Sequence, residues 1–506
     1  MIDNWLEILS FRFTKLIQFD EEKKVVSLYK IKGMDTIEFR HQAHLMVDWM
    51  ADYLETVEQH PVKSQVKPGQ IFNQLPSLPP EKSESMETIF DDFKTIILPG
   101  ISHWQSPNFF AYFPANNSYP SILGEMLTAA LGAQCMIWET SPAATELEEI
   151  TMNWLKQMIG LPPQWEGVIQ DSASSSTLAA ILSARERASG FTINDQGFTN
   201  KEKFRIYCST ETHSSIDKAV KIAGLGRTNL KKIGVDKQFA LNPDSLEQAL
   251  VQDIANGFNP MCVIATIGTT SSTAIDPIEK IAAICNKYNI WLHIDAAFAG
   301  TALILPEYRW MIKGIESANS FVFNPHKWMF TNFDCSALFV KEKETLLRTF
   351  EILPEYLRTT THGKVNDYRD WGVQLGRRFR ALKLWFVIRN FGVKGLQEKI
   401  RFHIELGQYF GQLVEKHTDF EIMAPFPFNT VCFRYTPEGL NDMDRINTLN
   451  ELILKELNKS GKIYLTHTRL SSKYTLRMVI GQTNVTKQHV DSAWDLICST
   501  AAGLNI

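Results

Sequence analysis

The chain has 506 residues, of which 44% are hydrophobic and 21% charged, so it is long enough for more than one domain with an ample apolar core. Its 52 lysine and arginine residues stand against 56 aspartate and glutamate residues, and the net charge of −4 gives no electrostatic reason to expect binding to nucleic acid or an anionic membrane. Its seven cysteines show no C-x-x-C spacing, which predicts free thiols in a reducing compartment.

No apolar run approaches the roughly 20 residues that a membrane-spanning helix needs. The charges between Arg12 and Lys24 interrupt any apolar core that a signal peptide would require. We therefore expect a cytoplasmic protein. The histidines are dispersed and there is no H-E-x-x-H motif, so the sequence predicts no metal site.

Residues 1–33 mix aromatic, aliphatic and charged side chains, and the sequence assigns them no role. From Asp35 to Val57 apolar residues recur at helical spacing, which predicts an amphipathic helix. The proline-rich stretch from Pro61 to Pro80 is typical of an extended connection, and a second helix is expected from about Ser85 to Ile97.

The stretch from His103 to Pro114 is dense in aromatic residues. Because Pro107 and Pro114 bracket it, a loop is more consistent with this stretch than a long regular element. Aromatic side chains on a loop suit the wall of a pocket for an aromatic ligand. A helix is then expected from Ala143 to Ile159, where Gly160 ends it.

A short strand from Gly167 is followed by small polar residues up to Thr177 and then by a helix. The free N–H groups at a helix start, together with serine hydroxyls, can bind an anion. An ordinary serine N-cap is the competing interpretation.

Strands and helices alternate from here to Val340, which predicts a parallel sheet with crossover helices. The pattern places His213 after the strand Phe204–Cys208, and it places Thr270, Asp295 and Lys327 after later strands. Open α/β sheets bind their ligands at these strand ends.

Lys327 lies in the segment Asn324–Trp328, between two apolar runs that predict buried strands. Burial disfavours the charged form of a lysine, so this side chain is paired, reaches solvent or is chemically used. A lysine on a surface turn is the alternative. Together with the acid Asp295 at the end of the preceding strand, it suggests a site for pyridoxal phosphate (PLP).

The polar stretch from Glu351 to Asp370 predicts either a lid over a site or a disordered excursion. The basic cluster Arg377–Arg380 favours a solvated helix start or internal ion pairs over a nucleic-acid patch. Beyond about Lys399 helices alternate with short strands, which predicts a smaller α+β domain.

The motifs Asn324-Pro325-His326-Lys327-Trp328 and His293-Ile294-Asp295-Ala296-Ala297 resemble those of the group II PLP-dependent decarboxylases. Within that group the chain is most similar to the aromatic-L-amino-acid decarboxylase family, from about Met34 to the C-terminus. The resemblance implies the PLP-dependent transferase fold (fold type I), an α/β fold with a mostly parallel central sheet flanked by helices. The implied organisation is an extension (1–33), an N-terminal helical dimerisation segment (34–115), a PLP-binding domain (116–398) and a small C-terminal domain (399–506).

The resemblance also implies roles for individual residues. Lys327 would form the Schiff base with PLP, Asp295 would keep the pyridine nitrogen protonated, and His213 would stack on the ring. Tyr356 on a closing loop would protonate Cα, and His326 would steady the carboxylate or the phosphate. The implied cofactor-binding set is Ala173, Ser174, His213, Thr270, Asp295, Ala297, Asn324, His326 and Lys327. Asp171 departs from the family pattern, which usually has glycine there, so cofactor affinity depends on where this acid points.

The substrate pocket implied by the resemblance contains Trp104, Tyr112, Phe113, Pro114, Ile137, Trp138 and Gly376. Ile137 and Trp138 would line the pocket of the partner subunit in a homodimer. Ala115 stands where many relatives have a hydroxyl residue, which removes one possible contact to the substrate. Gly376 leaves room for a large ring, because relatives that prefer histidine, and some plant relatives that prefer a phenol, often carry serine there.

The resemblance therefore implies decarboxylation of an aromatic L-amino acid, such as L-DOPA, tyrosine, tryptophan, 5-hydroxytryptophan or phenylalanine, to the arylalkylamine and CO2. An aromatic aldehyde synthase on the same scaffold is the first alternative, and Tyr356 and His213 disfavour it. A catalytically inactive PLP-fold binding protein is the second alternative, and Lys327 and Asp295 argue against it.

Overall fold

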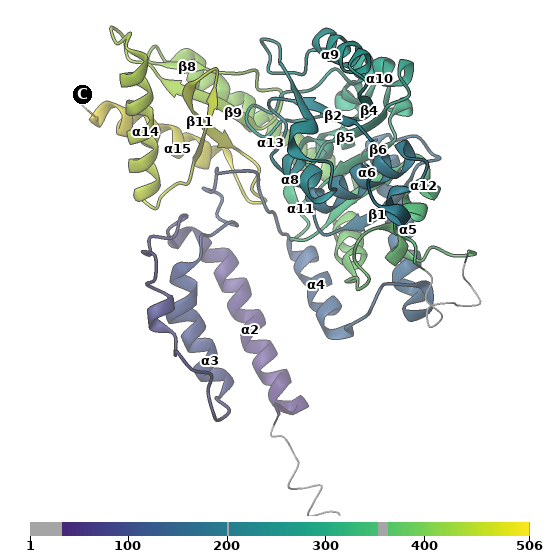
Figure 1. Ribbon diagram of the computed structural model, residues 1–506. Helices are drawn as coiled ribbons and strands as arrows, with labels where there is room; N and C mark the ends of the chain where they lie inside the picture. The colour runs from purple at the N-terminus through teal and green to yellow at the C-terminus, as the bar shows by residue number, and fades with distance from the viewer. Residues whose placement is uncertain (1–32, 200–201, 353–362, 505–506) are drawn as a thin grey trace, which may run out of the picture. The chain divides into compact units, whose positions relative to one another are not determined.

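The computed structural model describes residues 33–199, 202–352 and 363–504, which form two compact units (Figure 1). The described part of the first unit comprises residues 33–57 and 75–96. Its helices are α2 (Thr36–Thr56) and α3 (Met86–Asp92), and a π-helical turn follows at Phe93–Ile97. The ring of Trp49 on α2 packs against Phe90 and Phe93, with ring centroids 5.5 and 5.4 Å away, so aromatic contacts join the two helices.

The second unit comprises residues 58–74 and the described residues from 97 onward, and a seven-stranded sheet dominates it. The strands are β1 (Glu166–Gln170), β2 (Phe204–Ser209), β3 (Leu230–Ile233), β4 (Asn259–Thr266), β5 (Trp291–Asp295), β6 (Ser320–Phe323) and β7 (Ser336–Val340). Their spatial order is β1-β7-β6-β5-β4-β2-β3. The predicted α/β fold with a mostly parallel sheet is confirmed.

Strand β7 differs from the prediction of a parallel arrangement up to Val340, because it runs antiparallel to both of its neighbours, β1 and β6. The connection between β6 and β7 contains only the four-residue helix α11 (Pro325–Trp328). A parallel crossover needs a longer segment, usually with a helix that packs across the sheet. The short connection therefore returns the chain antiparallel and keeps α11 at the edge of the sheet.

Both faces of this sheet are buried. Along β4, Val263 and Ala265 contribute to one apolar cluster, whereas Cys262 and Ile264 contribute to another on the opposite face. This alternation follows from the two-residue period of a strand, and a continuous apolar strand such as β4 suits a sheet covered on both sides. The surrounding helices are α4 (Tyr119–Leu131), α5 (Pro142–Ile159), α6 (Ala173–Ala188), α7 (Ile193–Gln196), α8 (Ser215–Ile222), α9 (Pro243–Ala255), α10 (Ile278–Lys287) and α12 (Lys343–Phe350).

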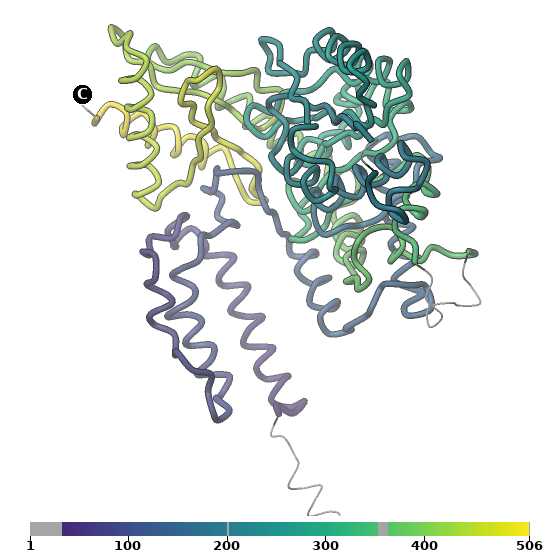
Figure 2. Tube along the Cα trace, in the orientation of Figure 1, coloured from purple at the N-terminus to yellow at the C-terminus, as the bar shows by residue number. Residues whose placement is uncertain are grey.

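The C-terminal part of the second unit contains a four-stranded antiparallel sheet in the order β10-β11-β9-β8. Its elements are β8 (Phe420–Ile422), β9 (Thr430–Tyr435), α14 (Met443–Lys459), β10 (Thr466–Leu470), β11 (Lys473–Val479) and α15 (Lys487–Gly503). The long helix α13 (Arg380–Lys416) joins it to the large sheet and is interrupted at Gly392, where φ is 65°. Figure 2 follows this path from the green to the yellow part of the chain. The predicted boundary at residue 398 falls within α13, and the domain limits stay a prediction.

Among the described residues, no helix has the length and apolar character needed to cross a membrane. The same residues contain no cluster of histidine, cysteine, aspartate and glutamate that could hold a metal ion. All seven cysteines lie in the described ranges as free thiols.

Candidate active site

A cavity of about 260 Å³ opens at the edge of the large sheet where the parallel strands end. Every residue that the sequence predicted for cofactor binding lines it: Ala173, Ser174, His213, Thr270, Asp295, Ala297, Asn324, His326 and Lys327. The lining also includes Phe113, Ser172, Ser215, Thr266, Gly268 and Phe298. The sheet thus brings together residues that are far apart in the sequence, most of them at the end of a strand or shortly after it.

The short helix α11 presents Lys327 to the cavity. Asn324 precedes the helix and donates its backbone N–H to the carbonyl of Ala297 at 3.0 Å, which ties the end of β6 to the segment after β5. Lys327 is partly buried, and burial lowers the pKa of its amine while the nearby Asp295 carboxylate opposes that shift. A lysine with a lowered pKa has more of the neutral amine that attacks a carbonyl carbon.

Asp295 is the last residue of β5 and lies between the ends of two neighbouring strands, opposite Thr266 and Val322. Its side chain is buried, and one carboxylate oxygen accepts the backbone N–H of Ala297 at 3.0 Å. A buried carboxylate that lines a cavity provides a strong negative charge for a protonated ring nitrogen.

His213 follows β2 and is held by a local hydrogen bond. Its Nδ1 accepts the backbone N–H of Ser215 at 3.1 Å, so in the neutral ring the proton is on Nε2. Although His213 is exposed, desolvation by the surrounding protein lowers its pKa, the charge of Lys327 lowers it further, and Asp295 opposes both. The ring is therefore disposed to remain neutral beside the lysine.

The start of α6 contributes Ser172, Ala173 and Ser174 to the wall of the cavity. The Ser172 hydroxyl caps the helix by accepting the N–H of Ser175 at 3.3 Å, which shows the serine N-cap, and the anion site stays a prediction. The N–H groups of Ala173 and Ser174, in the first turn, have no intrahelical acceptor and are free to bind an anion. Asp171 does not line the cavity, and its carboxylate lies 3.4 Å from the Ser172 hydroxyl.

Among the residues that the structure describes, two buried polar side-chain atoms in the cavity wall lack hydrogen-bond partners. These are Oγ1 of Thr266 and Oδ1 of Asn324, both buried in side chains that line the cavity. Buried polar atoms are nearly always paired in folded proteins, because an unpaired one loses its bond to water without replacement. A polar ligand in the cavity would satisfy them.

An aromatic stack forms another part of the wall. The ring centroids of Phe113 and Phe298 are 3.9 Å apart at 12°, and those of Phe298 and Trp328 are 5.0 Å apart. The Lys327 amine and the Arg477 guanidinium each lie about 5 Å from the centre of the Phe113 ring, at 5.2 and 5.1 Å. Sequence reasoning missed Phe298, although it follows Asp295 by three residues.

Six of the predicted substrate residues lie outside the lining of this cavity: Trp104, Tyr112, Pro114, Ile137, Trp138 and Gly376. The ring of Trp104 stacks on Phe109, with centroids 4.4 Å apart, and Trp138 donates its indole N–H to Glu146 at 2.9 Å. Phe113 is the predicted substrate residue that the structure places in the cavity. Tyr356 lies outside the described residues.

A profile of the pyridoxal-dependent decarboxylase conserved domain matches residues 68–436. The chain belongs to the pyridoxal-dependent decarboxylase family. Its cofactor is accordingly PLP, and the protein is a PLP-dependent carboxy-lyase.

Individual relatives agree with this assignment. The chain is 42% identical to tyrosine decarboxylase 4 of Petroselinum crispum over 495 residues, which cover 95% of this chain and 97% of the relative. It is 43% identical to a phenylacetaldehyde synthase of Arabidopsis thaliana over 484 residues, which cover 94% of this chain and 98% of the relative. The crystal structure of Catharanthus roseus tryptophan decarboxylase in complex with L-tryptophan has a TM-score of 0.88 at 39% identity, and the match covers 93% of this chain and 99% of that chain.

The cavity fits PLP in its charges and its unsatisfied groups. Lys327 and Asp295 suit the aldehyde and the pyridine nitrogen of the cofactor, and the start of α6 suits its phosphate. The unpaired oxygens of Thr266 and Asn324 can each accept a hydrogen bond from a cofactor or from its bound water.

Proposed function

We propose that this decarboxylase removes CO2 from aromatic L-amino acids, with tyrosine, tryptophan, L-DOPA, 5-hydroxytryptophan and phenylalanine as candidate substrates, and releases the arylalkylamine. The observation that carries the proposal is one cavity in which Lys327, Asp295 and His213 meet an aromatic wall. The tyrosine and tryptophan decarboxylases among its relatives support the aromatic substrate class.

Bound PLP supplies an electron sink for the negative charge that remains at Cα when CO2 leaves. Asp295 holds the proton on the pyridine nitrogen, because its buried carboxylate favours the cationic form of its partner. Lys327 would hold the cofactor through its amine, which the substrate amino group would replace during turnover. His213 covers the ring and, with Nδ1 bonded to Ser215, can donate from Nε2 toward the departing carboxylate.

The charges around Phe113 favour an amino acid as the substrate. Arg477 places a cation 5.1 Å from the centre of this ring, and among the described residues one terminal nitrogen of Arg477 is buried without a hydrogen-bond partner. Such a setting attracts the carboxylate of the substrate, whereas the stacked rings of Phe113 and Phe298 offer an apolar surface to an aromatic side chain.

The identity of the product depends on the proton that reaches Cα. We assign this proton to Tyr356, on the resemblance of the sequence alone. If dioxygen instead oxidises this carbon before a proton reaches it, the products are an aldehyde, ammonia and hydrogen peroxide, and the phenylacetaldehyde synthase among the relatives makes this the second candidate function.

A second copy of the chain is the proposed partner. On α4, the apolar residues Tyr119, Leu123, Leu127 and Leu131 recur at four-residue spacing and are 62, 53, 47 and 63% exposed. Residues at this spacing share one helix face, and an exposed apolar face of this kind is typical of a protein interface. A homodimer would bury it, and Ile137 and Trp138 would then approach the partner's cavity.

A product assay tests the function. The purified protein would be supplied with PLP and, separately, with tyrosine, tryptophan, L-DOPA, 5-hydroxytryptophan, phenylalanine, histidine and glutamate, and CO2, amine and hydrogen peroxide would be measured together. We expect equal amounts of CO2 and amine from at least one aromatic substrate, without peroxide. Peroxide and aldehyde in place of amine would establish the aldehyde synthase, and turnover of glutamate alone would reject the aromatic substrate class. Light scattering of the same sample tests the homodimer.

A further inference from the structure

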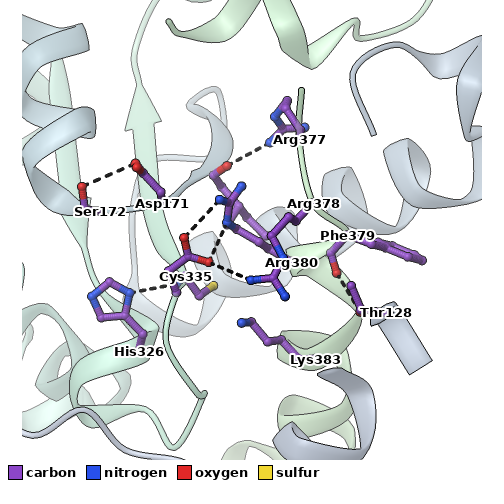
Figure 3. A network of polar contacts seen from close by, with 12 residues as sticks. Thr128, Asp171, Ser172, His326, Cys335, Arg377, Arg378, Phe379, Arg380 and Lys383 are labelled. Carbon is purple, nitrogen blue, oxygen red and sulfur yellow. Dashed lines mark hydrogen bonds and ion pairs between the residues drawn. The ribbon is translucent and has the colours of Figure 1, made fainter. Parts of the chain in front are cut away.

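The basic cluster at the start of α13 forms ion pairs within the protein, which agrees with one of the interpretations of the sequence (Figure 3). Arg377 pairs with Glu148 at 2.6 Å, and both side chains are buried. Arg380 makes a two-pronged pair with Asp334, with Nε 3.0 Å from Oδ1 and one terminal nitrogen 3.1 Å from Oδ2. Two parallel bonds of this kind fix the orientation of both groups as well as their distance.

Asp334 belongs to the connection between α11 and β7, immediately downstream of the helix that carries Lys327. The next residue, Cys335, is bonded to His326 in both directions. Its backbone N–H donates to Nδ1 of His326 at 2.8 Å, and its carbonyl accepts the backbone N–H of His326 at 3.3 Å. Figure 3 shows the His326 ring joined to this strand start, with Arg380 close by. The ion pair therefore holds the segment that orients the imidazole.

These bonds define what the ring of His326 offers to the cavity. Because Nδ1 accepts a hydrogen bond, the neutral ring carries its proton on Nε2. Burial lowers the pKa of His326 to about 3, and the adjacent charge of Lys327 acts in the same direction, so the ring stays neutral. No hydrogen bond joins Nε2 to any of the described residues, and the side chain lines the cavity.

We propose that Arg380 is a positioning residue for the cofactor: its ion pair with Asp334 holds Cys335 against His326, so that Nε2–H of His326 is a fixed hydrogen-bond donor to the phosphate of PLP. The inference rests on the PLP site of the proposed function and adds a residue that does not line the cavity. A neutral donor suits this place, because cationic groups already surround it in Arg380 and Lys383. The energetic benefit is preorganisation, since the donor is oriented before the phosphate arrives.

The test compares two ligands of the apoenzyme, PLP and pyridoxal, which lacks the phosphate. In Arg380→Gln we expect the dissociation constant for PLP to rise about tenfold, the size expected when one charge-assisted hydrogen bond is lost. The constant for pyridoxal should change by less than about twofold, because the contact is to the phosphate alone. If the dissociation constants for PLP and pyridoxal rose equally, or if that for PLP did not change, the proposal would be overturned.

A double-mutant cycle separates positioning from general stability. If Arg380 acts through His326, then Arg380→Gln should add less than about twofold to the PLP dissociation constant of His326→Gln. Additive losses would show that Arg380 acts by another route. Arg401→Gln is the matched control, since Arg401 lies on the same helix and pairs with Glu307 at the surface, and it should leave both constants unchanged.

Two further variants test the same proposal if Arg380→Gln does not fold. Asp334→Asn removes the charge of the acceptor but keeps its size, and it should show the same selective loss of PLP over pyridoxal. Arg380→Lys keeps the charge without the two-pronged geometry and should recover part of the PLP affinity. The dissociation constants are measured without substrate. If the wild-type protein turns over no aromatic amino acid in the product assay, the role of Arg380 can still be tested.

Discussion

The residues at the cofactor end of this site and those predicted for its substrate end are positioned by different parts of the fold. Every residue predicted to bind the cofactor lines one cavity, whereas Phe113 is joined there by none of the other predicted substrate residues. The cofactor residues lie at the ends of strands of one sheet or within a few residues of them. The predicted substrate residues come from loops and from the segment around Trp138, whose positions depend on distant parts of the chain.

The register of the sheet explains the first result. Thr266, Asp295 and Val322 are direct neighbours on β4, β5 and β6, and adjacent strands lie about 4.8 Å apart. A polar residue placed just after each strand must therefore approach the others. By contrast, the segment that contains Tyr112 is anchored by Phe109, which pairs with Tyr464 near the small sheet.

The largest effect is expected at the centre of the cofactor end. Lys327→Ala should abolish turnover and the visible absorbance band of the lysine-bound cofactor, because no other lysine lines the cavity among the described residues. Rates and absorption spectra at saturating PLP check this prediction. Lys341→Ala is the control, since Lys341 follows β7 and bonds to the carbonyl of Glu316 outside the cavity. Near-normal turnover by Lys327→Ala would remove this residue from the mechanism.

The second-largest loss of activity is expected for a substitution of Asp295, which also belongs to the cofactor end of the site. Asp295→Asn should lower kcat by about 10²- to 10⁴-fold, because a neutral amide cannot hold the pyridine nitrogen protonated. The asparagine oxygen can still accept the N–H of Ala297, so the thermal unfolding temperature should change little. Steady-state kinetics and a melting curve of the same variant measure the two quantities. A small loss of kcat with an intact fold would contradict the role assigned to this acid.

A matched pair of substitutions sharpens the comparison at the substrate end. Phe113→Leu should lower kcat/KM for the preferred aromatic substrate about tenfold, because Phe113 lines the cavity and stacks on Phe298. Trp104→Leu should have an effect of less than about threefold, since Trp104 lies outside the lining and packs on Phe109. Steady-state kinetics of the two variants, measured side by side, give both kcat/KM values. Equal losses would mean that the substrate end extends to Trp104 and that the cavity in one chain is incomplete.

Local patterns predicted several of the elements, and the family resemblance supplied most of the residues that line the cavity. The apolar runs at Ser320–Phe323 and Ser336–Val340 became strands with those bounds, and the helix expected from Ala143 is α5. The direction of β7 was not predictable in this way, because strand direction depends on the connection and not on the apolar run itself. Phe298 was missed because an aromatic residue after a strand is usually part of the core.

Charge networks were the least accessible to sequence reasoning. The basic cluster Arg377–Arg380 indicated ion pairs but not their partners, since Glu148 and Asp334 lie far away in the sequence. The effect of Asp171 was equally open, because an acid beside a helix start can point into the site or away from it. In the structure Ser172, not Asp171, caps α6.

The smallest effect on PLP affinity is expected for a substitution of Asp171, because Ser172 caps α6. Asp171→Asn should change the dissociation constant for PLP by less than about threefold, because the carboxylate lies outside the cavity lining and its charge is partly offset by Arg380, whose pKa it helps to raise. Titration of the apoenzyme with PLP at two salt concentrations measures this. Ser172→Ala is the informative comparison, since it removes the helix cap itself and should weaken PLP binding more than Asp171→Asn does. Much tighter binding by Asp171→Asn would instead show that the acid faces the phosphate, so that the cofactor end, like the substrate end, depends on a loop that the strand pattern does not position.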